Sequence, residues 1–159
     1  AANEGARERA ADERVQSVGI RVELPFEQEV NPFVQEAFEH QTFFTRLHQF
    51  VIMSDAYVVV PGGIGTVLEA MLVWQLLQGR HLPPTPFVLF GDHWRGLLNW
   101  IRNDTLARGY VDQKDADLPT LVNTVDETVG VIVRTNIEFE DAAVRGATGA
   151  QMDPHHDQR

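Results

Sequence analysis

The sequence has 159 residues, 43% of them apolar, and a formal net charge of −10. This length suits one domain, and no apolar run approaches the ~20 residues that span a bilayer. The negative charge, without a basic cluster to offset it, argues against nucleic acid as a partner. The absence of cysteine excludes disulfides and thiolate metal sites in this chain. With no secretory segment visible, we expect a cytoplasmic protein that needs no metal and no cofactor and contacts no membrane.

Lysine is almost absent, because Lys114 is the single lysine of the sequence. A P-loop needs a lysine next to its glycines, and pyridoxal chemistry needs a lysine that forms a Schiff base. Lys114 stands in the polar stretch 111–115, for which we expect an exposed loop. The sequence therefore argues against a P-loop and against pyridoxal-dependent decarboxylation.

The first predicted elements alternate between helix and strand. Residues 1–14 are rich in Ala, Glu and Arg and predict a helix that has no N-cap before it. Residues 17–24 alternate apolar and other side chains, as a strand does. A helix is predicted over residues 33–53. The β-branched run over residues 56–60 then predicts a central parallel strand that is covered on both faces.

After the glycines that follow this run, a helix is predicted over residues 66–78, and Gly79 stops it in a left-handed conformation. The remaining predicted elements are a strand over 87–90, a helix from Asp92 to Gly109, a strand over 120–123 and a helix opened by Thr124. This alternation predicts a Rossmann-like, doubly wound parallel α/β sheet. We expect a single domain over residues 1–140 and a flexible tail over residues 141–159. Ligands of such sheets bind beyond the carboxyl ends of the strands.

The glycine loop Pro61-Gly62-Gly63-Ile64-Gly65-Thr66 is the strongest candidate site. Glycines tolerate positive φ and lack Cβ atoms, so the backbone N–H groups can approach a ligand closely. The helix that follows adds its free N–H groups and the positive end of its dipole. We therefore predict phosphate binding by Gly62, Gly63, Ile64, Gly65 and Thr66. The alternative is a tight turn that needs glycine for its geometry alone.

Glu69 is a candidate for chemistry beside this loop. A carboxylate in the first turns of an anion-binding helix lies near the bound phosphate. However, Thr66 and Glu69 also have the spacing of a capping box, which requires no function. Thr124 and Glu127 have the same spacing without a glycine loop. Spacing alone therefore favours a structural role for Glu69, and its position favours a functional one.

Arg46 is the second candidate. It lies eight residues before Ser54, which is about 12 Å back along a helix at ~1.5 Å per residue. The strand over residues 56–60 rises about 13 Å in the opposite direction. These two lengths predict that Arg46 comes level with the glycine loop. The alternative is a solvated arginine at the edge of an apolar stripe.

Residues 61–69 resemble the PGGxGTxxE motif of the Lonely Guy family of cytokinin riboside monophosphate phosphoribohydrolases, many of which carry the older label lysine decarboxylase. The resemblance covers roughly residues 1 to 135 and includes residues 23–28, 31–32, 43–46, 54–56 and 93–98. It implies that Arg46 and Glu69 are the catalytic pair. The implied reaction is hydrolysis of the N-glycosidic bond of a nucleoside 5′-monophosphate, cytokinin riboside monophosphate or an AMP-like nucleotide, to a free base and ribose 5-phosphate. The implied assembly is a homodimer.

The sequence departs from the family in two respects. Leu47 stands where the family usually has a lysine. The start of the sequence resembles the helix that follows the family's first strand–helix–strand segment, so we expect that segment to be absent from this chain. Three hypotheses stay open: a phosphoribohydrolase, a non-catalytic nucleotide or cofactor carrier of the same fold, and an inert fragment.

Overall fold

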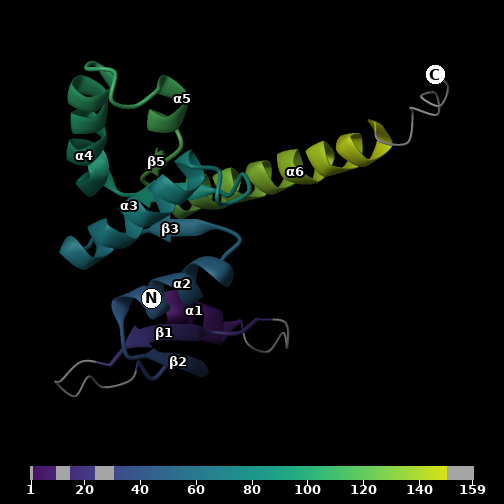
Figure 1. Cartoon of the computed structure of the whole chain (residues 1–159). Coiled ribbons are helices and arrows are strands. Elements are labelled where there is room, and N and C mark those ends of the chain that lie inside the picture. Colours follow the sequence, from purple (N-terminus) through teal and green to yellow (C-terminus); the bar gives the residue numbers. More distant parts are fainter. Residues whose placement is uncertain (1, 10–14, 24–30, 150–159) are drawn as a thin grey trace, which may run out of the picture. The chain divides into compact units, whose positions relative to one another are not determined.

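The computed structural model divides into two compact units, residues 1–54 and residues 55–159 (Figure 1). The residues that the structure describes are 2–9, 15–23 and 31–149. Parts of four predictions lie outside them, namely residues 1 and 10–14 of the first helix, residue 24 of the first strand, residues 24–28 of the family resemblance and residues 150–159 of the tail.

The described residues of the first unit form two parallel strands and two helices (Figure 1). Its elements are α1 (Ala2–Glu8), β1 (Val18–Val22), β2 (Glu36–His40) and α2 (Phe43–Ile52). Val18 of β1 lies opposite Glu36, and Val22 lies opposite His40. Helix α2 packs against both strands, and Leu47 is its buried residue.

The helix that the sequence predicts over residues 33–53 is wrong in its first part, where residues 36–40 form strand β2. Thr42 has an extended backbone, and its hydroxyl oxygen accepts the N–H of Thr45 at 3.2 Å. Thr42 is therefore the N-cap, and the helix begins only at Phe43. The residues before Thr42 find their hydrogen-bond partners on β1 instead. Because Phe38 is the only large apolar residue of β2, the pattern of the strand is too weak to predict it.

The second unit contains a three-stranded parallel sheet in the order β3–β4–β5. The strands are β3 (Tyr57–Val59), β4 (Phe87–Phe90) and β5 (Thr120–Val122). Tyr57 lies opposite Phe87, and Val88 lies opposite Thr120. The strands are parallel and alternate with helices, which confirms the predicted Rossmann-like α/β fold class.

The position of β3 in this sheet differs from the prediction. β4 is the central strand, and its Val88 and Leu89 are 0% exposed. β3 lies at the edge of the three strands, and its Val58 is 42% exposed. Within this unit, the apolar run over residues 56–60 is therefore not covered on both faces. A β-branched run alone does not distinguish a central strand from an edge strand.

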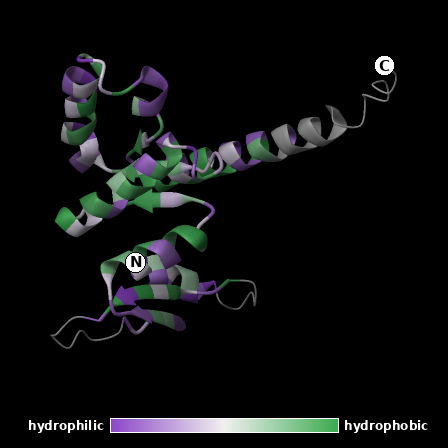
Figure 2. Ribbon diagram, viewed as in Figure 1, coloured by the Kyte–Doolittle hydropathy of each residue, from purple (hydrophilic) through white to green (hydrophobic). Residues whose placement is uncertain are grey.

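The helices of the second unit surround a core that includes Trp74, Phe87 and Trp94. Figure 2 shows that α3 is hydrophobic along most of its length. Helix α6 continues to Gly149, past the predicted start of the tail. The helical elements are α3 (Ile64–Gln78), a 3₁₀ turn (Asp92–Trp94), α4 (Arg95–Trp100), a π-helical segment (Ile101–Leu106), α5 (Gln113–Ala116) and α6 (Val125–Gly149).

Helix α3 ends at Gln78, as predicted, but Gly79 is not the residue in the left-handed conformation. Gly79 has an ordinary right-handed φ of −74°, whereas Arg80 has a left-handed φ of +56°. The N–H of His81 donates to the carbonyl of Leu76 at 2.9 Å, and the N–H of Arg80 donates to that of Leu77 at 3.1 Å. These are the two bonds of a Schellman motif. Arg80 therefore occupies the position at which glycine is the usual residue.

Helix α6 begins with a complete capping box. The hydroxyl oxygen of Thr124 accepts the N–H of Glu127 at 3.2 Å. One carboxylate oxygen of Glu127 accepts the N–H groups of Asn123 and Thr124 at 2.9 and 3.0 Å. The bonds from Asn123 and Thr124 hold the pKa of Glu127 below its ordinary value. Ionised Glu127 therefore stabilises the start of α6.

We expect Glu127→Gln to lower the thermal unfolding temperature at pH 7 and to have a progressively smaller effect as the pH is lowered. The pKa of Glu127 is lowered in the folded state, so its contribution is present above the unfolded pKa and is lost as the pH falls through the folded pKa. Glutamine resembles the protonated side chain. Thermal unfolding followed by circular dichroism from pH 7 to about pH 3 tests this expectation. A difference that stayed constant over this range would contradict it.

Candidate active site

The glycine loop joins β3 to α3, and the helix begins earlier than predicted. Gly63 is the N-cap, with φ −93° and ψ −158°, so Ile64, Gly65 and Thr66 form the first turn. Val67 is the first residue whose N–H bonds back to the chain, to the carbonyl of Gly63 at 3.0 Å. Among the described residues, the N–H groups of residues 63–66 have no hydrogen-bond partner. They carry the positive end of the helix dipole.

The structure gives different reasons for glycine at positions 62, 63 and 65 of the loop. A Cβ atom at Gly62 would lie 2.7 Å from the Cβ of Thr66, so a close approach requires glycine there. A Cβ atom at Gly63 or Gly65 would meet nothing within 4 Å. Contrary to expectation, none of the three glycines has a positive φ. Turn geometry therefore explains Gly62 but not Gly63 or Gly65, whose missing Cβ atoms leave the N–H groups open to a ligand.

Thr66 and Glu69 do not form the capping box that their spacing suggests. Thr66 is the third residue of α3 rather than its N-cap. Thr124 and Glu127, which have the same spacing, do make the reciprocal bonds of a capping box. The structural role that accounts for Glu127 therefore does not account for Glu69.

Glu69 shares one face of α3 with the open part of the first turn. It follows Gly65 by four residues and Thr66 by three, and residues at these separations are neighbours on a helix. Helical side chains lean towards the N-terminus, over the preceding turn. The half-buried carboxylate of Glu69 thus lies one turn from the open N–H groups, above the space that the missing Cβ of Gly65 leaves.

The ends of the neighbouring strands meet this loop. A Cβ atom at Gly91, which follows β4, would lie 3.5 Å from Cγ of Pro61. The N–H of Gly91 donates to the carbonyl of Val122 at 2.7 Å. The carboxyl ends of β3, β4 and β5 therefore come together. This is the edge at which ligands of parallel α/β sheets bind.

Sequence reasoning missed a polar pair at this edge. The Arg95 guanidinium hydrogen-bonds the Asp92 carboxylate, and this bond and the charge of Arg95 hold the pKa of Asp92 below its ordinary value. Asp92 is not the predicted helix cap, because Gly91 is the N-cap and no side-chain cap bond forms. The sequence did contain a signal for this pair, because Asp92 comes two residues after the end of the predicted buried strand over residues 87–90.

Arg46 lies on α2 in the first unit, whereas the loop and Glu69 belong to the second unit. Its Nε donates to the carbonyl of Ile20 on β1 at 3.1 Å, and the side chain is half-buried. Arg46 is therefore anchored on the sheet of its unit rather than solvated. Its position beside the loop stays a prediction.

The described residues contain no group of three or more His, Cys, Asp or Glu side chains that could hold a metal ion. Nor does that part of the chain contain a helix long and apolar enough to cross a membrane.

A family model described as "Possible lysine decarboxylase" matches residues 1–132 of this chain. The chain belongs to this family, the Lonely Guy family. The matched residues include the glycine loop, Glu69 and Arg46. The resemblance read from the motif is therefore confirmed.

One curated relative has a related name. The cytokinin riboside 5′-monophosphate phosphoribohydrolase of Mycobacterium tuberculosis is 34% identical over 77 residues. The matched segment covers 48% of this chain and 41% of that protein. The chain thus matches less than half of the length of this relative.

The decarboxylase label of the Lonely Guy family does not fit the lysine of this chain. Lys114 is the single lysine, and its side chain is 66% exposed and lies 3.8 Å from Asp112. It stands on α5 rather than in the predicted loop. A lysine that forms Schiff bases is typically desolvated in an apolar pocket or placed beside another cation. Lys114 has solvent and a carboxylate around it instead.

In the first unit, the departure from the family at Leu47 also has a structural explanation. Leu47 is the buried residue of α2 and is 9% exposed. A lysine at this position would bring its ammonium group to the apolar side of the helix, where a charge is costly. Leucine therefore suits the packing of α2 against its strands.

Proposed function

We propose that this chain hydrolyses the N-glycosidic bond of a nucleoside 5′-monophosphate and releases the free base and ribose 5-phosphate. The observation that carries the proposal is the open first turn of α3, with Glu69 one turn behind it on the same face. Membership of the Lonely Guy family and the name of the mycobacterial relative support the same activity.

In this proposal the 5′-phosphate binds the N–H groups of residues 63–66. Four N–H groups that have no partner among the residues described, at the positive end of a helix, suit a phosphate group. The missing Cβ atoms at Gly63 and Gly65 let the phosphate oxygens reach hydrogen-bond distance. The ribose then extends along α3 towards Glu69.

Glu69 acts on the ribose in this proposal. As the bond between C1′ and the base nitrogen breaks, its electron pair leaves with the base, and positive charge develops on the ribose ring. The Glu69 carboxylate stabilises that charge or takes a proton from the attacking water, as carboxylates do in glycoside cleavage. The water oxygen bonds to C1′, and a proton goes to the base.

Arg46 supplies a guanidinium to the same reaction. A guanidinium is planar, stays charged and binds phosphate or ribose oxygens with paired donors. The hydrogen bond from Nε of Arg46 to the carbonyl of Ile20 positions the guanidinium. The two terminal nitrogens of the guanidinium are the groups proposed to reach the nucleotide.

We expect Arg46→Ala to lower the rate of base release about tenfold or more, because a charge-assisted contact to the nucleotide is lost. Arg21→Ala is the matched control, since Arg21 lies on β1 of the same unit and pairs with Glu39. Chromatographic assay of base release from both variants tests the role of Arg46. Full activity in Arg46→Ala would remove it from the site.

The proposed function is tested by incubating the protein with AMP and, in parallel, with isopentenyl-AMP. Chromatographic detection of adenine or isopentenyladenine is the expected result. Absence of both bases, together with nucleotide binding in a calorimetric titration, would favour the carrier. Absence of both release and binding would favour the inert fragment.

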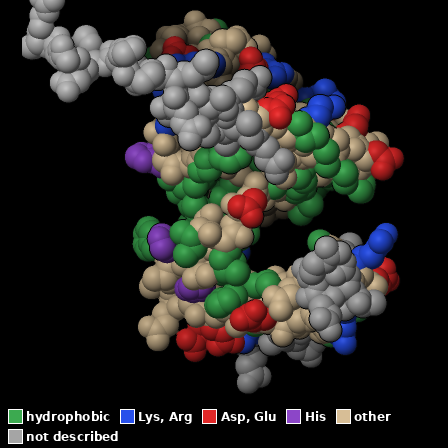
Figure 3. Space-filling model, turned by 90° about the vertical axis from the view of Figure 1, so that its right-hand side faces the viewer, with side chains coloured by type: hydrophobic (Ala, Val, Ile, Leu, Met, Phe, Trp, Pro, Cys, Tyr) green, Lys and Arg blue, Asp and Glu red, His purple; other side chains and the backbone are tan. Residues whose placement is uncertain are grey.

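We also propose that the protein acts as a homodimer. Ile64 and Leu68 on α3 are 86% and 52% exposed, and Phe44 on α2 is 85% exposed. Hydrophobic side chains also gather on the face of the second unit that Figure 3 turns to the viewer. Exposed apolar patches of this kind are typical of subunit contacts. Light scattering coupled to size-exclusion chromatography should give twice the mass of one chain.

A further inference from the structure

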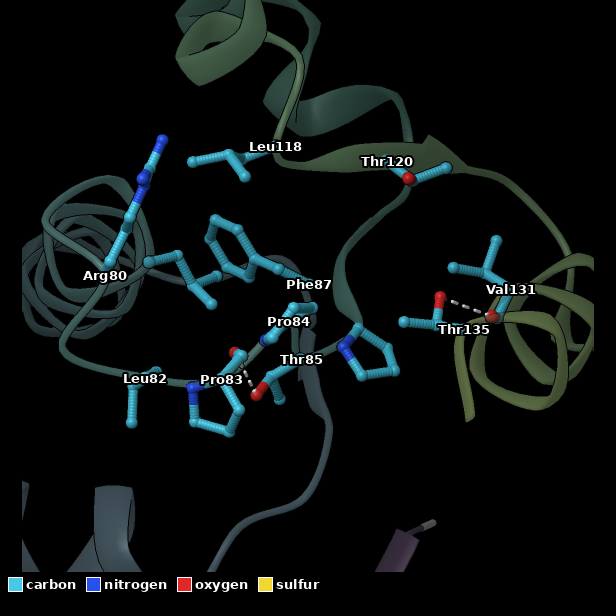
Figure 4. A pocket seen from close by; sticks show the side chains of 12 residues that line it. Arg80, Leu82, Pro83, Pro84, Thr85, Phe87, Leu118, Thr120, Val131 and Thr135 are labelled. Carbon is cyan, nitrogen blue, oxygen red and sulfur yellow. Dashed lines mark hydrogen bonds between the residues drawn. The ribbon is translucent and has the colours of Figure 1, made fainter. Parts of the chain in front are cut away.

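A cavity of about 420 Å³ opens in the second unit, away from the glycine loop (Figure 4). It lies between the end of α3, the starts of β4 and β5, and α6. Phe87 and Thr120, the first residues of β4 and β5, line it. The cavity is therefore at the amino ends of the parallel strands, whereas the glycine loop follows the carboxyl end of β3. The cavity and the glycine loop therefore lie at opposite ends of the strands of one sheet.

The wall of this cavity is apolar. Leucine, proline, valine and phenylalanine side chains form most of it. The hydroxyl of Thr85 donates to the carbonyl of Pro83 at 2.9 Å, and the hydroxyl of Thr135 donates to the carbonyl of Val131 at 3.0 Å (Figure 4). The hydroxyl protons of Thr85 and Thr135 are thus used within the wall, and Thr120 is the third threonine that lines the cavity.

Arg80 is the one charged residue among those that line the cavity. Its φ of +56° lies in the left-handed region, which is unfavourable for a residue with a Cβ atom. No ion pair or side-chain hydrogen bond of Arg80 occurs within the described part of the chain. Figure 4 shows its side chain rising from the end of α3 beside Leu118. A glycine would avoid the strain, but it would leave the rim without a charge.

We propose that this cavity binds a small monocarboxylic acid with an apolar body, whose carboxylate pairs with Arg80. Guanidinium groups bind carboxylates through two parallel hydrogen bonds, and the apolar wall suits a hydrocarbon or aromatic body. The volume lies within the range of small-molecule sites. This site is separate from the proposed nucleotide site and does not depend on it.

The test compares two ligands with the same carbon skeleton and different head groups, the carboxylate 4-phenylbutyrate and the uncharged alcohol 4-phenylbutan-1-ol. Each is titrated into the full chain, and backbone amide resonances are followed by NMR. The acid should shift the resonances of Leu82, Phe87 and Thr120 and bind about tenfold more tightly than the alcohol. Arg80→Gln should remove that difference by weakening the acid alone. Arg108→Gln is the matched control, because Arg108 is exposed and pairs with Asp104 at another place.

Two results would overturn the inference. One is equal affinity for the acid and the alcohol in the unaltered protein. The other is an Arg80→Gln variant that is folded by circular dichroism and still prefers the acid. Val131→Phe, which adds volume to the wall, provides an independent test and should weaken both ligands. Unchanged binding of the two ligands by that folded variant would place them outside the cavity.

Discussion

Replacing Glu69 by glutamine is expected to lower kcat for release of the base from AMP by about 100-fold or more. Glutamine keeps the shape of the side chain and loses its negative charge. It can neither stabilise a positive ribose ring nor take a proton from water. The proposed phosphate contacts of the first turn of α3 involve backbone groups, which the substitution leaves in place. We therefore expect the affinity for the nucleotide to change little.

The chain contains a matched control for this substitution. Glu127→Gln removes the same charge at the same spacing from a threonine, but in a complete capping box on α6. We expect it to affect stability and to leave kcat unchanged. Steady-state kinetics and nucleotide titrations on both variants separate the two roles. Normal turnover by Glu69→Gln would end the catalytic assignment, and equal losses in both variants would point to a general effect on the fold.

The second large effect is expected from Gly65→Ala. A Cβ atom at this position meets nothing within 4 Å, so the protein accommodates it without rearrangement. Alanine is the better helix former, so the free energy of unfolding should rise by about 0.5 kcal/mol. The added methyl group occupies the space proposed for the phosphate. Loss of about 2 kcal/mol of charge-assisted hydrogen bonding weakens nucleotide binding roughly 30-fold.

Gly130→Ala is the control for Gly65→Ala. Gly130 lies inside α6, and a Cβ atom there would meet only the end of the Arg134 side chain, at 4.0 Å. The substitution should give a similar gain in stability and leave nucleotide affinity unchanged. Denaturant unfolding and calorimetric titration measure the two quantities. A Gly65→Ala variant that bound nucleotide normally would mean that the loop is only a turn.

Gly62→Ala should behave in the opposite way to Gly65→Ala. Its Cβ atom would lie 2.7 Å from the Cβ of Thr66, so the start of α3 must shift. Stability should fall here, whereas at Gly65 it should rise. The two substitutions therefore distinguish a glycine that the fold requires from a glycine that a ligand requires.

Local patterns were sufficient for the elements around the loop. The buried strand over residues 87–90 was predicted with its observed bounds, and Thr124 opens α6 as the capping signal indicates. Both signals act within a few residues, through apolar side chains in sequence or through one hydroxyl and the nearby N–H groups. The spacing of Thr66 and Glu69 suggested a capping box in the same way and was misleading, because the N-cap of α3 is Gly63 rather than Thr66.

The sequence by itself determined the α/β fold class, the glycine loop with Glu69 behind it, and the family, because these depend on residues close together in the chain. Only the tertiary structure decided that residues 36–40 form a strand, since β1 supplies their hydrogen-bond partners. It also decided that β4 rather than β3 is central, and that Arg80 takes the left-handed position at the rim of the cavity. Each of these depends on groups that are distant in sequence or on backbone geometry, neither of which leaves a local pattern.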